Sequence, residues 1–355
     1  MFVALRDLRA ARGRFLLITL VVTLVAVLVS FLSGLTAGLA HQNISAVESI
    51  SADAIVFADT GADPSFDASA LTSRQVETWQ AAAGPDGTVD PVGISHAEAA
   101  VVGRSAGESA QVALFGAAGA AFGNRVATEQ GTVVLSSGAA AALDARTGDT
   151  VTLGTGTFTV ASVGGDDWYS HTPVVWSTLA DWQSVSPRGG TATVLAVSGI
   201  PNISAVDTTA HTTTTTVSGS LSALSAYQAE NGSLTLMTVL LFAISALVIG
   251  AFFTVWTVQR APDIATLKAL GATSGSLVRD ALAQAATVLA VGVTLGLGIT
   301  VVAATFLGDA LPFVLALTTT LLPAVALIAL GLLGAAFALR FLFTTDPLTA
   351  LNAAR

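Results

Sequence analysis

Residues 258–280 carry the side chains best suited to binding chemistry in this sequence, and they lie between two long apolar runs. Three cationic groups occur here, namely Arg260, Arg279 and Lys268, which is the only lysine in the sequence. Basic side chains that flank an apolar run are typical of the cytoplasmic side of a membrane. The segment therefore predicts either a docking surface for a soluble partner or a basic loop that only fixes topology.

The apolar residues of this segment would form the docking surface. Asp263 can cap a short helix, and Gly271 suits the left-handed residue that follows the last turn of a helix. The apolar residues of that helix are spaced three apart and share one face. They are Ile264, Leu267 and Leu270. Thr273 or Ser274 can then cap a second helix, which continues into the next apolar run.

The sequence contains no motif for hydrolysing ATP, a peptide or an ester. Without a G-x-x-x-x-G-K-[ST] motif the chain cannot hold an ATP phosphate in the P-loop manner, so any ATP must be hydrolysed by a separate polypeptide. Neither H-E-x-x-H nor G-x-S-x-G occurs, and we expect neither enzymatic activity nor a metal site. Apart from Arg340, the last residue of the fourth run, the apolar runs hold no ionisable side chains, which disfavours ion-coupled transport.

Composition places the chain in the membrane class. Of its 355 residues, 53% are hydrophobic and 10% are charged, and the mean hydropathy is +0.74. The absence of cysteine excludes disulfides and thiolate metal ligands.

Charge is divided unevenly along the chain. Residues 41–233 hold five arginines against eighteen Asp and Glu, a net of −13, whereas the segments that flank the membrane on the other side hold nine Lys and Arg against four acids, a net of +5. Asp309 supplies the last −1 of the total of −9. Basic residues cluster only beside the apolar runs, which argues against nucleic acid as a partner.

Four apolar runs are each long enough to cross a hydrocarbon core of about 30 Å. They are residues 15–40, 234–257, 281–307 and 321–340. We predict a membrane α-helical protein with four transmembrane helices and a mixed α+β extracytoplasmic domain, residues 41–233, between the first and second. The basic flanks place both termini in the cytoplasm, with an amphipathic helix over residues 1–14 and a tail over residues 341–355. Residues 308–320 are then a short outer loop.

A cleaved signal peptide is the alternative for the first apolar run. That run extends over about 25 residues, whereas the apolar region of a signal peptide has roughly 7–15. We therefore expect a retained helix.

Residues 41–233 are richer in Asp, Ser, Thr and Gly, and β-type alternation appears in them. Strands are expected over residues 53–57 and 111–115, and a hairpin over residues 150–163. Helices are expected over residues 73–82 and 137–145, and an extended segment over the threonine run 212–216.

One sequence motif resembles the coupling segment of the FtsX/MacB-like permeases, which are the membrane subunits of type VII ABC transporters. The motif is R-x-x-D-I-x-x-L-K-A-L-G-A-T, from Arg260 to Thr273. The ending D-P-x-x-A-L, from Asp346 to Leu351, is similar to that of the same family, and residues 133–163 resemble its extracytoplasmic core domain. The resemblance implies a homodimer in a bacterial cell membrane, with two copies of a cytoplasmic ABC ATPase subunit and mechanotransmission to the outer domain. It also implies a set of residues that couple to the ATPase. These are Ile264, Leu267, Lys268, Leu270 and Gly271.

Two further stretches of sequence point to a subgroup within this family. The runs RDLRAARGRFLLI and NGSLTLM, which precede or begin the first and second spans, are similar to those of HrtB-type haem-exporter permeases. This resemblance implies haem as substrate, taken from the outer leaflet. Export of lipoproteins, macrolides or peptides remains an alternative, as does FtsX-like activation of a cell-wall hydrolase without transport.

Haem iron takes His, Tyr, Met or a carboxylate as an axial ligand. The candidates at the outer ends of the first and second spans are His41, Tyr227, Glu230 and Met237. The other histidines are expected to be solvated or hydrogen-bonded within the outer domain. They are His96, His171 and His211.

Overall fold

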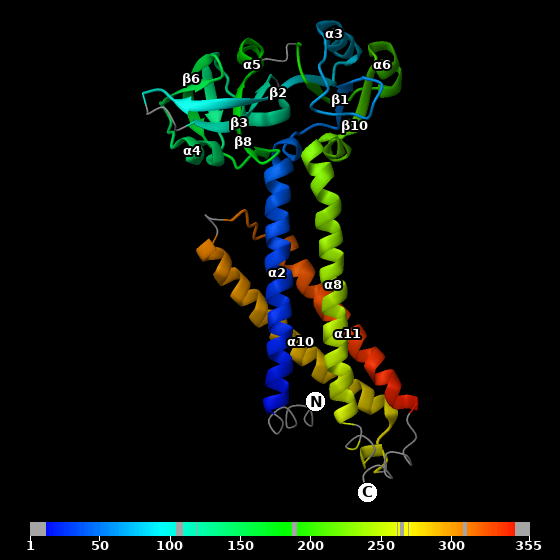
Figure 1. The fold of residues 1–355 in the computed structure, drawn as a ribbon. Coiled ribbons are helices and arrows are strands. Elements are labelled where there is room, and N and C mark those ends of the chain that lie inside the picture. The colour runs from blue at the N-terminus through cyan, green and yellow to red at the C-terminus, as the bar shows by residue number, and fades with distance from the viewer. Residues whose placement is uncertain are drawn as a thin grey trace. The chain divides into compact units, whose positions relative to one another are not determined.

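The structure is a computed structural model that describes residues 12–103, 109–118, 120–186, 190–260, 262, 266–268, 270–307 and 311–344. Its internal contacts divide the chain into two compact units. We call residues 39–232 the inserted domain, and residues 1–38 with 233–355 the helical unit. The elements can be followed along the chain in Figure 1.

Four of the described helices are long and apolar enough to cross a membrane, as the sequence predicted. They are α2 (Arg12–Glu48), α8 (Ser225–Gln259), α10 (Ser274–Leu307) and α11 (Leu317–Thr344). Each helix extends beyond its apolar run, because a helix ends at a cap or turn and not where the apolar residues end. An α/β domain lies between the first and second helices in the sequence, so the predicted fold class is confirmed.

Glycine permits close helix packing in the helical unit. A Cβ placed on Gly292 or Gly296 of α10 would collide with α2, and one placed on Gly334 of α11 would crowd the backbone of Gly250 on α8. Small residues let apolar helices approach closely in lipid, where no hydrophobic force drives helices together. Gly298 has open space at its Cβ position and makes no such contact.

The loop that precedes α11 packs against α2. A Cβ on Gly34 would collide with the ring of Phe313, and one on Gly38 would collide with the carbonyl of Pro312. The Phe313 ring also lies 5.4 Å from that of Phe31, centroid to centroid. The space beside Gly34 and Gly38, which are four residues apart on α2, is thus filled by a loop and not by another helix.

Ten described strands belong to the inserted domain. They are β1 (Ala54–Ala58), β2 (Thr88–Val101), β3 (Ser109–Ala117), β4 (Thr132–Leu135), β5 (Thr150–Leu153), β6 (Gly156–Val163), β7 (Trp168–Tyr169), β8 (Thr172–Thr178), β9 (Val194–Ser198) and β10 (Thr212–Thr216). The sheet order is β10-β1-β9-β2-β3-β8-β4-β6-β5, and β7 pairs with β8. Because β5 also pairs with β2, the described strands from β2 to β5 in this order close into a barrel.

Short helices cover the sheet. They are α3 (Ser73–Ala82), α4 (Ser137–Leu143), α5 (Leu179–Val185), α6 (Ile203–Ala210) and α7 (Val217–Ser220), with 3₁₀ turns η1 (Ala120–Arg125) and η2 (Leu221–Ala223). Trp182 of α5 is buried against the cross-strand glycine pair Gly93 and Gly116, where an added Cβ would collide with the indole. Its indole N–H donates to Ser95 Oγ at 3.0 Å.

The local predictions for this domain agree with the structure. Thr72 caps α3 through a reciprocal capping box with Gln75. The hairpin over residues 150–163 is β5–β6, which pair antiparallel. The threonine run is β10, paired antiparallel with β1. The amphipathic helix over residues 1–14 and the C-terminal tail lie, apart from their residues closest to the spans, outside the described residues.

Candidate functional site

A loop of the inserted domain, residues 166–172, contacts both helices that carry the predicted ligands. Ser170 and His171 of this loop have positive φ angles of 48° and 62°. Such backbone is strained for residues with a Cβ. It aims two successive N–H groups at α2, where they donate to the carbonyls of Asn43 and Gln42 at 3.0 and 2.9 Å. The loop is therefore held to α2 by its main chain.

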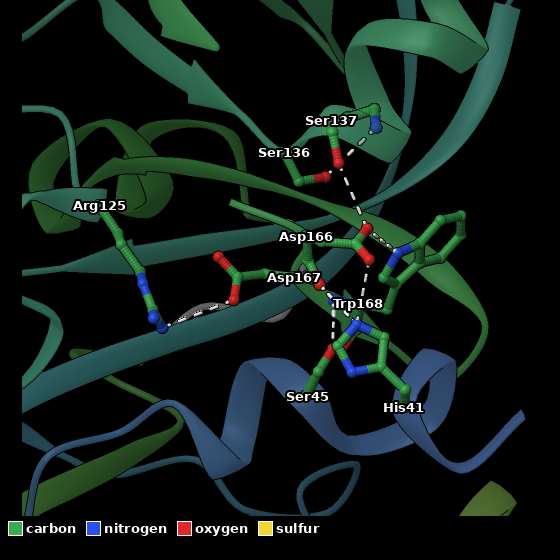
Figure 2. Close-up of polar contacts among 9 residues, drawn as sticks. His41, Ser45, Arg125, Ser136, Ser137, Asp166, Asp167 and Trp168 are labelled. Carbon is green, nitrogen blue, oxygen red and sulfur yellow. Dashed lines mark hydrogen bonds and ion pairs between the residues drawn. The ribbon is translucent and has the colours of Figure 1, made fainter. Parts of the chain in front are cut away.

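His41 of α2 is tied to this loop, as Figure 2 shows. Its Nε2 lies 2.9 Å from the backbone carbonyl of Asp166 and 3.2 Å from the Oδ2 of the same residue. A carbonyl oxygen only accepts, so Nε2 carries the proton and the lone pair of the neutral ring is on Nδ1. While this contact persists, His41 can offer only Nδ1 to a metal.

The carboxylate of Asp166 gathers further donors. It accepts from the indole N–H of Trp168 at 2.7 Å and from the hydroxyl of Ser137 at 3.3 Å. The backbone N–H of Trp168 donates in turn to Ser45 Oγ on α2, at 2.9 Å. These contacts fix the loop to α2 at a second point.

Glu230, in the second turn of α8, forms the other polar cluster. Both of its carboxylate oxygens lie 3.0 Å from Nε2 of His171, and Asn43 Nδ2 donates to Oε2 at 3.4 Å. With Glu230 as the carboxylate, His171 donates through Nε2 and keeps its lone pair on Nδ1. A carboxylate that orients an imidazole in this way is common behind metal-ligating histidines.

The structure thus brings two of the four predicted ligands to one loop. His41 and Glu230 both bond to residues 166–172, whereas Tyr227 is partly buried against the hydrophobic core of the inserted domain. Met237 lies in the helical unit with 50% of its surface exposed. Among the described residues, no group of three or more His, Cys, Asp or Glu is arranged to hold a metal ion.

Sequence reasoning missed the partners of these ligands. Asp166, Asn43 and the role of His171 carry no local signal, because each pairs with a residue far away in the chain. The expectation that His96 and His171 bond within the inserted domain agrees with their contacts to Thr172 Oγ1, at 3.4 Å, and to Glu230. Three of the chain's four histidines therefore meet this one loop.

Asp167, beside these residues, is a buried acid with a structural role. Its Oδ1 lies 3.5 Å from Arg125 Nη1, and its Oδ2 accepts from the Trp176 indole at 3.2 Å. Burial raises the pKa of this carboxyl above its ordinary 3.8, and the positive charge of Arg125 opposes that shift only in part.

The described coupling residues lie in a different part of the chain, in the helical unit. Residues 266–268 are helical, and Gly271 ends the helix with a φ of +95°. The Gly271 N–H donates to the Lys268 carbonyl and the Ala272 N–H to the Leu267 carbonyl, each at 3.0 Å, which is a Schellman motif. Asp263 and Ile264 lie outside the described residues.

Residues 235–347 match the family model described as FtsX-like permease C-terminal. The chain contains an FtsX-like permease domain. This permease is similar along its length to the putative hemin transport system permease protein HrtB of Staphylococcus haemolyticus (strain JCSC1435), with 25% identity over 366 residues, 99% of each chain. Proteins of the same description from two strains of Staphylococcus epidermidis are 24% identical over 198 residues, or 55% of the permease and 56% of the relative.

Two solved structures are also similar to part of the permease. The periplasmic region of MacB from Actinobacillus actinomycetemcomitans has a TM-score of 0.36 and 15% identity, covering 49% of the permease and 92% of that chain. The extracellular domain of the ABC-type transporter YknZ from Gram-positive bacteria has a TM-score of 0.31 and 12% identity, covering 44% and 87%.

The four described helices that are long and apolar enough to cross a membrane, together with the match to a permease family model, indicate a membrane protein. The curated relatives that it matches are described as permeases of a hemin transport system.

The pKa of Asp167 generates a prediction. An acid with a raised folded-state pKa contributes most to stability below its unfolded pKa of 3.8, and this contribution is lost as the pH rises through the folded-state value. Asp167→Asn removes the ionisation. We expect the variant to gain least from acidification, so that its melting temperature relative to the native protein is highest at pH 7 and falls toward pH 4. Tryptophan fluorescence during heating of the full chain in detergent measures this.

The exposed Asp86→Asn controls for the loss of one negative charge. If the Asp167 and Asp86 variants showed the same pH dependence, burial of Asp167 would not be the cause.

Proposed function

We propose that this permease is the membrane subunit of an ATP-driven efflux complex that exports haem taken from the outer leaflet. The observation that carries the proposal is the similarity to a putative hemin transport permease over 99% of both chains. The complex would be a permease homodimer in lipid with two copies of a cytoplasmic ATPase, which binds the ATP. The spans at residues 15–40, 234–257, 281–307 and 321–339 hold no Asp, Glu, Lys or Arg. A substrate taken from the outer leaflet needs no polar path through them.

The proposed haem ligands are His41, Tyr227, Glu230 and Met237. Haem combines a flat apolar ring with carboxylates and accepts imidazole, phenolate, carboxylate or thioether ligands at its iron. Tyr227 and Glu230 are spaced three residues apart on α8, which supports their placement on one face of this helix. The bond between His171 and Glu230 supports a role for His171 in orienting that carboxylate.

Removal of two of these ligands tests the site. In Glu230→Ala combined with Met237→Ala, we expect the Soret band of bound haemin to shift or vanish, with affinity at least about tenfold lower, which corresponds to about 1.4 kcal/mol. Cells carrying the variant should become sensitive to haemin, while the ATPase still assembles with the permease. Visible spectroscopy of the purified complex and growth on haemin provide the measurements.

The matched control is Asn43→Ala, which removes a contact to Glu230 but keeps all proposed ligands. Equal loss of haem in this control would mean that Glu230 acts through packing. Unchanged spectra and tolerance in the double variant would refute the site. If the native complex also failed to bind haem, an exporter of lipoproteins, macrolides or peptides, or an FtsX-like regulator of a cell-wall hydrolase, would replace the haem assignment.

We propose that the ATPase docks on the segment from Ile264 to Gly271 and that its movement passes along α8 to the inserted domain. Leu267 and Leu270 support this, because 42% and 80% of their surfaces are exposed beside Lys268. Apolar side chains this exposed at the end of a helix outside the spans are available for contact with a partner.

A charge in this surface is expected to weaken docking. Burial of one leucine is worth about 2 kcal/mol, so Leu270→Asp should weaken ATPase binding roughly thirtyfold. Gly271→Val should also impair docking, because a β-branched residue is strained at the φ of this position. Ser276→Asp, which adds the same charge at an exposed site in the first turn of α10, is the control. Co-purification and ATPase stimulation report the result, and full retention of both by the Leu270 variant would leave the segment a topology signal.

We further propose that both termini lie in the cytoplasm and the inserted domain outside the cell. The net of −13 in residues 41–233 against +5 in the opposite flanks supports this orientation. Single cysteines at the exposed Thr208 and Ser276 should react with an impermeant thiol reagent from outside and from inside, respectively. Labelling of both from one side would refute the orientation.

A further inference from the structure

Arg260 directly follows α8, which ends at Gln259, and its side chain turns to a neighbouring helix. Its Nη1 donates to Gln284 Oε1 of α10 at 2.6 Å. Its Cζ lies 5.2 Å from the centroid of the Trp256 ring, one turn back on α8, in a cation–π contact. The guanidinium thus bonds two helices at the point where the chain leaves α8.

Gln284 is an amide in an apolar setting. Only 4% of its surface is exposed, and it lies within the apolar run of α10. The buried hydroxyls of Thr23, Ser245 and Thr300 each bond a carbonyl one turn back in their own helix. An amide side chain buried among apolar groups needs a partner. Gln284 finds it on another helix.

Trp256 extends the cluster to a third helix. Its indole is 7% exposed, and its ring meets those of Phe15 of α2 and Phe253 of α8 edge to face, at 5.8 and 6.0 Å between centroids. The guanidinium of Arg260 therefore rests on an aromatic group that α2 and α8 share. Three of the four long helices meet at this point of the helical unit.

The position of this cluster in the chain is what suggests a role beyond packing. Arg260 and Gln284 are 24 residues apart, and the proposed docking segment lies between them. Pro262, two residues after Arg260, disfavours continuation of α8. At the other end, Thr273 caps α10, since its Oγ1 accepts from the Ser276 N–H at 3.4 Å. The Arg260–Gln284 bond thus closes a loop that contains the docking segment.

We propose that Arg260 is a positioning residue that couples displacement of the docking segment to joint movement of α8 and α10, acting through Gln284 and Trp256. A docking segment held only by its backbone could move by distorting the end of one helix while the other helix stays in place. With the guanidinium bound to both helices, a displacement must carry both. This inference rests on the proposed ATP-driven function but not on the identity of the substrate.

The test measures movement of α8 in the absence of any substrate. The chain has no cysteine, so Thr235→Cys on the exposed surface of α8 provides a single reporter. In the assembled complex, we expect the rate of maleimide labelling to differ about fivefold between the ATP–vanadate and nucleotide-free states, a typical size for coupling between sites. Gln284→Leu and Arg260→Lys should bring that ratio close to one, while the rate of ATP hydrolysis stays within about twofold of the native rate.

Conservative variants separate positioning from charge and from packing. Arg260→Lys keeps the positive charge but loses the planar guanidinium that stacks and bonds in a fixed geometry. Gln284→Glu keeps an acceptor and should retain the native ratio. Thr287→Val, at an exposed position one turn further along α10, should leave the ratio unchanged.

Each outcome decides the proposal. A native ratio in Gln284→Leu would overturn it, and so would loss of the assembled complex in that variant, since the contact would then serve folding. An equal loss of the ratio in Thr287→Val would overturn it too. Absence of a nucleotide-dependent ratio in the native complex would refute the ATP-driven function itself, which distinguishes the two failures.

Discussion

An apolar medium supplies no hydrogen-bond partner, and the packing of the helical unit follows from this constraint. Several hydroxyls of the long helices bond carbonyls of their own backbone, and Thr23 and Thr300 are examples. Helices approach through glycine at Gly292 and Gly296, because close contact replaces the hydrophobic force that lipid removes. The buried Gln284 side chain instead accepts a hydrogen bond from the Arg260 guanidinium at the end of α8.

The inserted domain folds under the opposite condition, which is contact with water. In contact with water, an irregular loop can expose unpaired backbone at little cost, so the loop over residues 166–172 is free to adopt strained backbone and to direct its N–H groups at α2. The pairing of β5 with β2 closes the strands from β2 to β5 and leaves β10 at the end of the strand order, and the slot between Gly93 and Gly116 holds an indole in the core. A rigid barrel thereby positions a loop that bonds the ends of two long helices.

In the inserted domain and in the helical unit alike, a cationic or potentially cationic side chain takes part in a polar contact near the end of a long helix. His41 and Glu230 meet the loop in the inserted domain, and Arg260 meets Gln284 in the helical unit. In each case the contact joins elements distant in the sequence, by 125, 59 and 24 residues. Helices whose apolar middle parts pack without specific bonds are thus defined at their ends by polar contacts, where water or an interface tolerates charge.

The sequence by itself determined the structural features that depend on residues close together in the chain. Spans follow from length and apolar content, the hairpin β5–β6 from alternation about a glycine turn, α3 from the Thr72–Gln75 box, and the end of the coupling helix from Gly271. Only the tertiary structure decided that Asp166 holds His41, that His171 and Asn43 hold Glu230, and that the barrel closes through β2 and β5. Each of these joins segments whose local sequence is compatible with many partners, and the choice among them is made by the packing of the whole domain.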